Sequence, residues 1–393
     1  MTLRTLDDLG ELAGARVFVR VDFNVPMKDG AVADDMRIRA TLPTLRELLD
    51  RGAALVLGSH LGRPKGDVRD DLRLAPAAAR LAELLVRPVT ALAATTPAEL
   101  PDDDVILLEN LRFDTGEEAN DPAFAGRLAE LVDAYVDDAF GAVHRAHASV
   151  SALPELMLAS GRPAVAGRLL QREVEVLSTL LHEAARPYVA ILGGAKVSDK
   201  LGTINALVDR VDALLVGGAM AFTLIAAGRG EVGDSLVEPD RFDEVREAMH
   251  HANERHIDLL LPIDVVAAPE ISSDADLSIV AAEKIPPGLM GLDIGPETVE
   301  AFGSKIAEAK TILWNGPMGV FEQEPFASGT LGVAQAIAAS AAFSVVGGGD
   351  SLLAVRQAGL EDAFGHLSTG GGASLEFLEG RRLPGIAILE ESA

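Results

Sequence analysis

The chain has 393 residues, 48% of them hydrophobic and 24% charged, which is enough for two domains with sizeable cores. Its formal net charge of −26 argues against nucleic acid or an anionic membrane as a partner, because both attract basic surfaces. The sequence has no cysteine, no signal-peptide pattern and no apolar run long enough to span a bilayer, which excludes thiol chemistry and predicts a cytoplasmic protein.

The first part of the chain alternates short apolar runs with helical patterns. We predict strands at 17–21, 54–57, 105–108 and 135–138, and helices at 36–50, 75–85 and 123–131. The segment 151–168 then carries two prolines and two glycines, and a long helix is predicted over 169–185. We therefore expect a boundary between two lobes within 151–168.

The second part of the chain repeats this pattern. We predict strands at 188–192, 213–216, 311–314 and 344–346, and helices at 200–208, 296–309 and 329–339. Strands and helices in alternation indicate an α/β protein whose parallel sheets are covered on both faces. Ligand sites in such proteins lie at the carboxyl ends of the strands.

Positive charge gathers directly after each of the four strands predicted in the first part. The segments are RVDFNVP, SHLGRPKG, ENLRF and DDAFGAVHRAHAS, and their basic residues, with those of the following helix, include Arg37, Arg39, His60, Arg63, Lys65, Arg112, His144, Arg145 and His147. Because arginine forks match phosphate and carboxylate oxygens, four such loops on one edge predict a pocket for a small polyanion. The alternative is that each arginine pairs with a nearby surface carboxylate. Asp22 and Asn24 are candidates for a substrate hydroxyl, or for a turn before Pro26.

Three glycine-rich turns follow strands in the second part: ILGGAKVSDK, SVVGGGDS and LSTGGGASLE. None is a Walker or GxGxxG motif, but glycines let backbone N–H groups approach phosphate oxygens. Lys196 and Lys200 are expected to reach phosphates and to share a helix face if a helix begins between them. Asp350 is the candidate ligand for Mg²⁺, and Glu322 for a ribose hydroxyl or for solvent.

Together with MGLDIGP and WNGPMGVFE, these motifs resemble the signatures of the phosphoglycerate kinase family, in that family's order and over nearly the whole chain. The resemblance implies two Rossmann-like lobes, each a parallel sheet flanked by helices, joined by a hinge helix. It implies that residues 1–168 bind 3-phosphoglycerate, that 169–375 bind the nucleotide, and that the tail 376–393 returns to the first lobe.

The resemblance also implies which residues act. The substrate-binding residues would be Asp22, Phe23, Asn24, Arg37, His60, Leu61, Gly62, Arg63, Arg112 and Arg145. The nucleotide-binding residues would be Lys196, Lys200, Gly291, Glu322, Gly348, Gly349, Asp350 and Ser351, with Asp350 on Mg²⁺. The catalytic groups would be Arg37, Lys196, Lys200 and the N–H groups of Gly371 and Gly372.

The implied reaction is reversible phosphoryl transfer from 1,3-bisphosphoglycerate to ADP, in line and with hinge closure, by a monomer of glycolysis and gluconeogenesis. Another acyl-phosphate kinase, a two-lobed binding protein for a phosphorylated metabolite, and a member without activity are the alternatives. The sequence departs from the family pattern at Arg168 and Gln171, in the expected hinge region.

Overall fold

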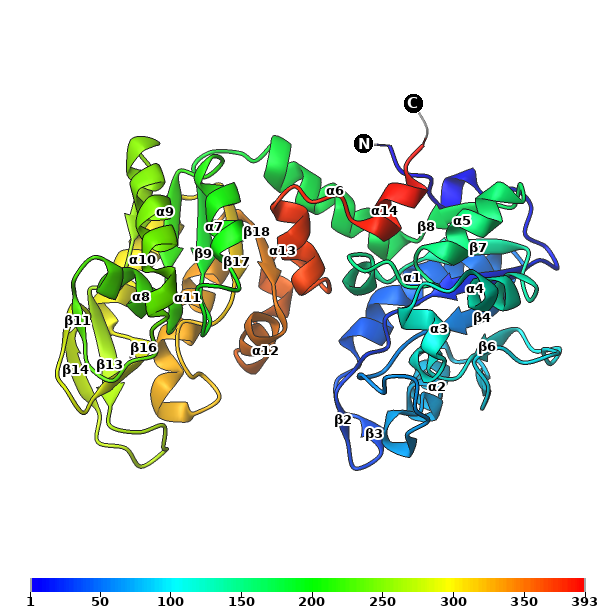
Figure 1. Cartoon of the computed structure of the whole chain (residues 1–393), viewed down its shortest axis with the longest axis horizontal. Coiled ribbons are helices and arrows are strands. Elements are labelled where there is room, and N and C mark those ends of the chain that lie inside the picture. Colours follow the sequence, from blue (N-terminus) through cyan, green and yellow to red (C-terminus); the bar gives the residue numbers. More distant parts are fainter. Residues whose placement is uncertain (1, 392–393) are drawn as a thin grey trace. The chain divides into compact units, whose positions relative to one another are not determined.

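The computed structural model describes residues 2–391, which form two compact units (Figure 1). The first unit extends to Glu175 and includes the segment from Arg382 onward, and the second is Val176–Arg381. Each unit is built on a six-stranded parallel sheet, so the predicted α/β class is confirmed. Met1, Ser392 and Ala393, which fall within the expected first lobe and tail, lie outside the described residues.

The elements of the first unit begin at the amino terminus and end with the last helix of the chain. Its strands are β1 Arg16–Arg20, β2 Met27–Lys28, β3 Ala31–Val32, β4 Ala54–Gly58, β5 Thr90–Ala91, β6 Val105–Leu107, β7 Ala134–Asp137 and β8 Ala164–Ala166. Its helices are η1 Leu6–Asp8, α1 Met36–Asp50, η2 Asp70–Leu72, α2 Ala75–Leu85, η3 Leu111–Phe113, α3 Thr115–Glu118, α4 Pro122–Ala129, η4 Phe140–Ala142, α5 Ala152–Ala159 and α14 Pro384–Leu389.

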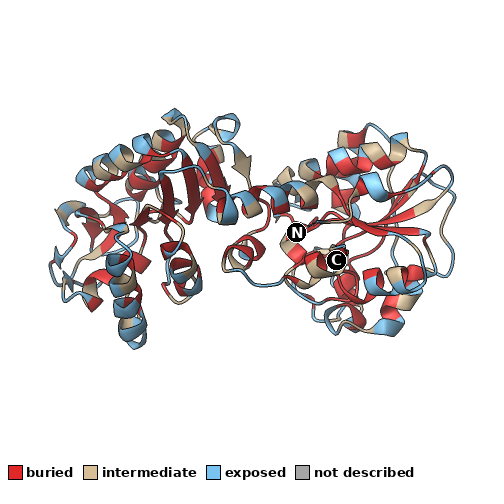
Figure 2. Ribbon diagram, turned by 90° about the horizontal axis from the view of Figure 1, so that it is seen from above, coloured by how far each residue is buried: buried red, intermediate tan, exposed pale blue. Residues whose placement is uncertain are grey.

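The sheet of the first unit has the order β5-β6-β4-β1-β7-β8, so β1 has β4 on one side and β7 on the other. Successive side chains of β1 face opposite layers, as the two-residue period of a strand requires. Val17 and Val19 are buried in the core with Leu45 of α1. Phe18 faces the other layer and stacks on Tyr135 of β7 at 5.8 Å. Figure 2 shows the resulting buried strands beneath helices whose outer faces are exposed.

The segment 151–168 is not an open linker, because it contains α5 and β8. β8 pairs in parallel with β7 and completes the first sheet. Pro154 is compatible with α5 because it lies in the first turn, where the backbone N–H has no partner within the helix. The prolines and glycines of this segment therefore mark turns inside the first unit, and the division between the units falls within α6, Arg168–His182.

The last helix, α14, packs on the first unit. Gly385 N–H donates to the carbonyl of Val143 at 3.0 Å, and Arg4 N–H donates to the carbonyl of Leu389 at 2.9 Å. A Cβ at position 385 would lie only 2.8 Å from a methyl group of Val150, so glycine permits this close packing.

The unusual Arg168 has a structural role at the start of α6. Its guanidinium lies 2.6 Å from the Asp7 carboxylate and 2.8 Å from the Glu47 carboxylate, and it also donates to the Gln171 side chain. These contacts join η1, α1 and α6 in the first unit. Arg168 and Gln171, the two departures from the family pattern, are thus partners of each other.

The second unit begins within α6. Its strands are β9 Tyr188–Leu192, β10 Ala213–Val216, β11 Glu231–Val232, β12 Asp258–Leu260, β13 Asp264–Ala268, β14 Ser278–Ala281, β15 Lys284–Ile285, β16 Met290–Ile294, β17 Thr311–Asn315, β18 Phe343–Gly347 and β19 His366–Leu367. Its helices are α7 Leu201–Val208, α8 Met220–Ala227, η5 Pro239–Arg241, α9 Phe242–Glu254, α10 Pro296–Glu308, η6 Glu324–Phe326, α11 Ser328–Ala339, α12 Gly349–Gln357, η7 Glu361–Ala363 and α13 Gly372–Leu378.

The sheet of the second unit has the order β12-β10-β9-β17-β18-β19. Numbered along the chain, this is the order 3-2-1-4-5-6 of dinucleotide-binding folds, and it reverses between β9 and β17. An additional antiparallel sheet, β14-β13-β16, lies beside α10 and α11 and was not predicted. Within residues 2–391, the structure contains no helix of the length and apolar character needed to cross a membrane.

Candidate active site

The first candidate region lies beyond the carboxyl ends of β1 and β4 and at η3, which follows β6. Arg37, in the first turn of α1, donates to the Asn24 carbonyl at 2.8 Å and lies 3.3 Å from the Asp22 carboxylate. The Asn24 side chain accepts the Gly62 N–H at 2.9 Å, and the Gly62 carbonyl accepts from Arg112 at 2.8 Å. These bonds join three of the four loops that carry the predicted substrate-binding residues, and Arg145 lies on the fourth, after β7.

Electrostatics show that the basic side chains converge. Burial is the main reason why the pKa of His60 is well below its usual range, and Arg20, Arg112 and Arg37 lower it further. Burial also lowers the pKa of His147 to about 4, again with contributions from nearby arginines. The site therefore combines guanidinium charges with neutral imidazoles.

We define the basic cluster as the cationic or imidazole side chains that α1 and the loops at this edge carry: Arg37, His60, Arg63, Arg112, Arg145 and His147. Arg63 and Arg145 are exposed, whereas Arg112 and His60 are almost completely buried. Burial is also the main cause of the lowered pKa of Arg112, and Arg145 contributes to it across the cluster. The cluster thus has a buried base and an exposed rim.

Two apolar residues implied by the family resemblance have buried side chains. Phe23 is 0% exposed and Leu61 is 4% exposed, and both belong to the hydrophobic core of the first unit. Phe23 also uses its N–H to bond the Ser59 hydroxyl at 2.8 Å. These two side chains shape the loops, and their contribution to a ligand is limited to backbone atoms.

Arg20 opens the first basic segment of the sequence but was not among the predicted binding residues, and it contacts the candidate site. It is the last residue of β1 and is 0% exposed, although arginine is among the residue types least often buried completely. Its guanidinium lies 3.1 Å from Nδ1 of His60 and donates to the Ser149 hydroxyl at 2.8 Å. The signal was its position after three apolar strand residues, Val17–Val19, and shortly before the Asp22–Pro26 turn.

The second candidate region lies at the reversal between β9 and β17. Gly194 N–H donates to the Pro317 carbonyl at 3.0 Å, and Gly218 N–H donates to the Met318 carbonyl at 3.0 Å. A Cβ at Gly193 would lie 2.1 Å from the Pro317 carbonyl oxygen. Glycine is therefore required for these strand-end loops to approach one another.

Lys200 lies in the middle of this region. Its ammonium group donates to the Asn315 carbonyl at 2.7 Å and also contacts the Asn315 side-chain oxygen. Burial lowers the pKa of Lys200 to about 8, although the charges of Asp350 and Asp199 favour the protonated form. A Cβ at Gly316 would lie 2.8 Å from the Lys200 nitrogen, so a larger residue there would crowd the ammonium group.

The helix after this loop begins later than we expected. α7 starts at Leu201, with Lys200 at its N-cap position, so Lys196 and Lys200 do not share a helix face. Ser198 instead binds the Glu238 carboxylate through its N–H at 3.0 Å and its hydroxyl at 2.7 Å, which holds the segment in a turn. Lys196 is exposed on this turn, whereas Lys200 points inward.

A cavity of about 360 Å³ lies beside the same loops, and we call it the β16 cavity. Three predicted nucleotide-binding residues line it, namely Gly291, Glu322 and Asp350. A Cβ at Gly291 would lie 2.1 Å from the Phe222 ring, which also lines the cavity. Leu236 and Ile271 are about half exposed there, so the cavity offers an apolar wall with polar groups at a few points.

The remaining predicted phosphate-binding residues lie at the starts of two helices. Gly348 is the N-cap of α12 with φ of 91°, and Ser351 in the first turn accepts the Gly316 N–H at 2.6 Å. Gly371 is the N-cap of α13 with φ of 52° and ψ of −114°, and Gly372 begins that helix. Gly348, Ser351 and the β17 loop are thus brought together with Lys200.

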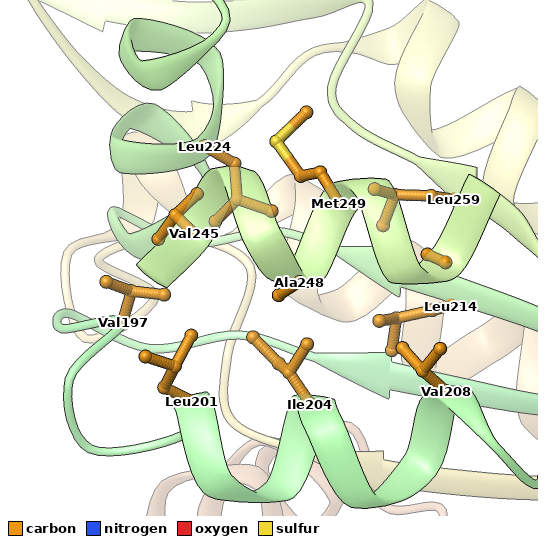
Figure 3. A pocket seen from close by; sticks show the side chains of 11 residues that line it. Val197, Leu201, Ile204, Val208, Leu214, Leu224, Val245, Ala248, Met249 and Leu259 are labelled. Atoms are coloured by element: carbon orange, nitrogen blue, oxygen red, sulfur yellow. The ribbon is translucent and has the colours of Figure 1, made fainter. Parts of the chain in front are cut away.

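The Lys200 loop rests on a closely packed apolar layer. Figure 3 shows Leu201 and Ile204 of α7 facing Val245 and Ala248 of α9. The cavity between these helices measures only about 10 Å³, about the least space that a water molecule requires. This packing gives the loop a rigid support.

We expect Leu201→Ala to lower the free energy of unfolding by about 2–4 kcal/mol, because it removes buried methyl groups and leaves a cavity. Leu353→Ala is the matched control, since this leucine of α12 is 42% exposed, and its effect should be below about 1 kcal/mol. Urea unfolding monitored by circular dichroism measures both. Equal losses in the two variants would contradict the supporting role of this layer.

The comparisons with known proteins agree with this geometry. The family model described as phosphoglycerate kinase matches residues 6–381. Proteins named phosphoglycerate kinase from Dictyoglomus turgidum and Salinispora tropica are 52% and 55% identical to the chain, over 100% and 99% of it and 100% of each relative. The solved phosphoglycerate kinase of Coxiella burnetii matches with a TM-score of 0.87 and 41% identity, covering 99% of both chains. That of Pyrococcus horikoshii matches with a TM-score of 0.85 and 32% identity, covering 99% of this chain and 98% of its own.

Proposed function

Since the chain belongs to the phosphoglycerate kinase family, we propose that its two candidate regions bind the two substrates of that family's reaction. The chain is a phosphotransferase with a carboxyl group as acceptor. It reversibly transfers a phosphoryl group from 1,3-bisphosphoglycerate to ADP, giving 3-phosphoglycerate and ATP. The observation that carries the assignment of sites is the convergence of the basic cluster in a protein of net charge −26.

We assign 3-phosphoglycerate to the basic cluster. Arg63, Arg112 and Arg145 would bind its phosphate, because guanidinium forks match phosphate oxygens. Asp22 and Asn24 would bind its hydroxyl group, and Arg37 would contact the carboxylate. Gly62, whose carbonyl already binds Arg112, keeps the loop close to the ligand.

We assign the nucleotide to the second unit. The β16 cavity, with Gly291 and Glu322, suits the base and ribose, because it combines an apolar wall with an acidic side chain. The phosphates would lie toward Lys196, Lys200 and the start of α12 at Gly348–Ser351. That helix start supplies free N–H groups and a favourable dipole for anions.

Mg²⁺ is the metal that the family resemblance implies, and the residues present fit an ion held by one protein carboxylate together with phosphate oxygens and water. Within residues 2–391, the structure contains no cluster of three or more metal-ligating side chains. Asp350 is an exposed carboxylate beside the proposed phosphate site. Mg²⁺ in kinases uses one or two carboxylates together with phosphate oxygens and water, so Asp350 suffices as the protein's contribution. The ion would neutralise phosphate charge when it is bound.

The chemistry needs no general base. In the direction of ATP consumption, a carboxylate oxygen of 3-phosphoglycerate attacks the γ-phosphorus, and the bond from that phosphorus to the bridging oxygen of ADP breaks. The nucleophile is already ionised at neutral pH, so the protein has only to position the groups and stabilise charge. We assign Arg37, Lys196, Lys200 and the N–H groups of Gly371 and Gly372 to the moving phosphoryl group.

Direct transfer requires the ligands of the two units to meet, so we propose that the units close when both substrates bind. Small-angle X-ray scattering should then give a smaller radius of gyration with 3-phosphoglycerate and a magnesium complex of a non-hydrolysable ATP analogue than with either ligand alone. An unchanged radius with both ligands would contradict closure.

We further propose that the enzyme acts as a monomer in the cytoplasm, with no nucleic-acid or membrane partner. A coupled assay of ATP formation from 1,3-bisphosphoglycerate and ADP tests the proposed substrate sites, when it is run on variants of Arg63 and Lys200. The same assay in reverse, with acetate in place of 3-phosphoglycerate, distinguishes another acyl-phosphate kinase. Activity with acetate alone would contradict the assignment.

A further inference from the structure

A buried chain of polar groups lies beneath the basic cluster. Arg20 is among the largest side chains that are completely buried in the described residues, and its position allows no contact with solvent. Its guanidinium donates to the carbonyls of Val21 and Gly58, to the Ser149 hydroxyl and toward Nδ1 of His60. Arg20 therefore connects the core of the sheet to an imidazole that we assign to the substrate site.

The chemistry of these buried groups determines which atom donates and which accepts in each of their hydrogen bonds. Glu117 is 0% exposed and accepts from the Ser149 hydroxyl at 2.6 Å, so the single hydroxyl proton of Ser149 is committed to that bond. Ser149 can then only accept from Nε of Arg20, at 2.8 Å. A guanidinium has donors and no acceptor, so Nδ1 of His60, at 3.1 Å, must accept as well.

We propose that Arg20 is a positioning residue that fixes His60 as the neutral tautomer with its proton on Nε2, and so makes His60 a hydrogen-bond donor to the anionic substrate. An imidazole whose Nδ1 accepts a hydrogen bond carries its proton on Nε2 when it is neutral. The identity of the substrate in this inference rests on the proposed function. The tautomer rests only on the contacts of Arg20.

The surroundings of His60 keep it neutral. A second proton, on Nδ1, would point at the Arg20 guanidinium and end their hydrogen bond. Arg37 of α1, Arg112 of η3 and His147 after β7 face the same ring and disfavour a further positive charge. Burial together with these charges holds the pKa of His60 well below its usual range. The donor on Nε2 is therefore present across the neutral pH range.

A neutral donor is useful at this position because it binds an anionic oxygen without adding to the repulsion among the arginines. A purely structural role for Arg20, bracing the ends of β1 and β4 through Val21 and Gly58, would be independent of the His60 tautomer. The tautomer therefore separates the two roles.

The test is a long-range ¹H–¹⁵N correlation spectrum of the full-length protein labelled with ¹⁵N-histidine, without ligand at pH 7.5, with His60→Gln used to assign the signal. We expect His60 to show the Nε2–H tautomer only, down to pH 6. A proton on Nδ1, or an imidazolium at pH 7.5, would overturn the proposal. The tautomer is read from the wild-type protein, and only the assignment of its signal uses a variant.

Two further comparisons test the positioning role. In Arg20→Lys, one ammonium group replaces the guanidinium and cannot donate to Ser149 and His60 together. His60 should therefore show both tautomers, while the backbone amide spectrum remains that of a folded protein.

His60→Gln keeps a donor near the Nε2 position, whereas His60→Asn keeps only the group facing Arg20. Calorimetric titration with 3-phosphoglycerate should show about tenfold weaker binding for His60→Asn than for His60→Gln. Equal affinities would overturn the donor role.

A failure of the proposed function gives a different result. If the wild-type protein does not bind 3-phosphoglycerate at all, the substrate assignment is wrong, while the spectrum still decides whether Arg20 fixes the tautomer.

Discussion

Replacing Lys200 by alanine should lower kcat about 10²–10³-fold while changing the affinity for 3-phosphoglycerate less than about threefold. The reason is the position of this ammonium group. It is held by Asn315 at the end of β17, in a loop region where Gly193 and Gly316 keep other side chains away. A charge that stabilises the moving phosphoryl group contributes most in the transition state, so its loss appears in kcat.

The pH dependence should identify the same group. Since burial lowers the pKa of Lys200 to about 8, its ammonium form is lost as the pH rises through that value in the free enzyme. We expect kcat/KM for the nucleotide to fall above pH 8, because this parameter reports the free enzyme. Lys200→Arg should remove this fall, since a guanidinium stays charged, although it would be slower than the wild type because it replaces a compact ammonium group.

Lys310→Ala provides the matched control for Lys200→Ala. Lys310 is exposed and directly precedes β17, whereas Asn315 ends it, so the two lysines lie at opposite ends of one strand. The control should retain activity within about twofold. Equal losses of kcat and of 3-phosphoglycerate affinity in Lys200→Ala would contradict the role assigned to this residue.

The sequence predicted most completely those elements whose pattern is decided locally. Met36–Asp50, Ala75–Leu85 and Tyr188–Leu192 have the bounds predicted for them, because an amphipathic helix or a buried strand has a clear period. α5 was missed because the two prolines and two glycines of 151–168 suggested a boundary between lobes. The β14-β13-β16 sheet was missed although its strands are close together in the chain; β14 has no fully buried residue, so its apolar pattern is weak.

The candidate site shows the same limit. That several basic loops should share one edge follows from parallel strands alone, and the structure places Arg37 and Arg112 accordingly. The contact of Arg20 with Ser149 joins residues 129 positions apart, and no period or motif in the sequence encodes it. The start of α7 was also misjudged, because the Ser198–Glu238 contact holds the preceding segment in a turn. Residue types could be predicted, but their partners depended on tertiary packing.

Arg37→Ala should have the second large effect, with a loss of about 10²–10³-fold in kcat and a weaker affinity for 3-phosphoglycerate. Arg37 lies in the first turn of α1, where the helix dipole disfavours a positive charge. Its side chain is 29% exposed, and the nearby Asp22 carboxylate leaves part of the guanidinium fork free for a ligand. The placement is unfavourable for the helix alone, which supports a role in binding the substrate carboxylate and the phosphoryl group.

Arg39→Ala is the matched control, because Arg39 lies two residues later on α1 and its 54% exposed side chain is paired with Asp35 at 2.8 Å. We expect its steady-state activity to stay within about twofold of the wild type.

Arg37→Lys keeps the charge but loses the planar fork, so its kcat should remain at least tenfold below the wild type. If Arg37→Lys were fully active, a positive charge alone would be enough for catalysis. The proposal that Arg37 bridges the substrate carboxylate and the phosphoryl group would then be wrong. If Arg37→Ala kept kcat within threefold, the carboxylate would have to be oriented by Arg112 or His60 instead, because these are the buried basic groups of the same cluster.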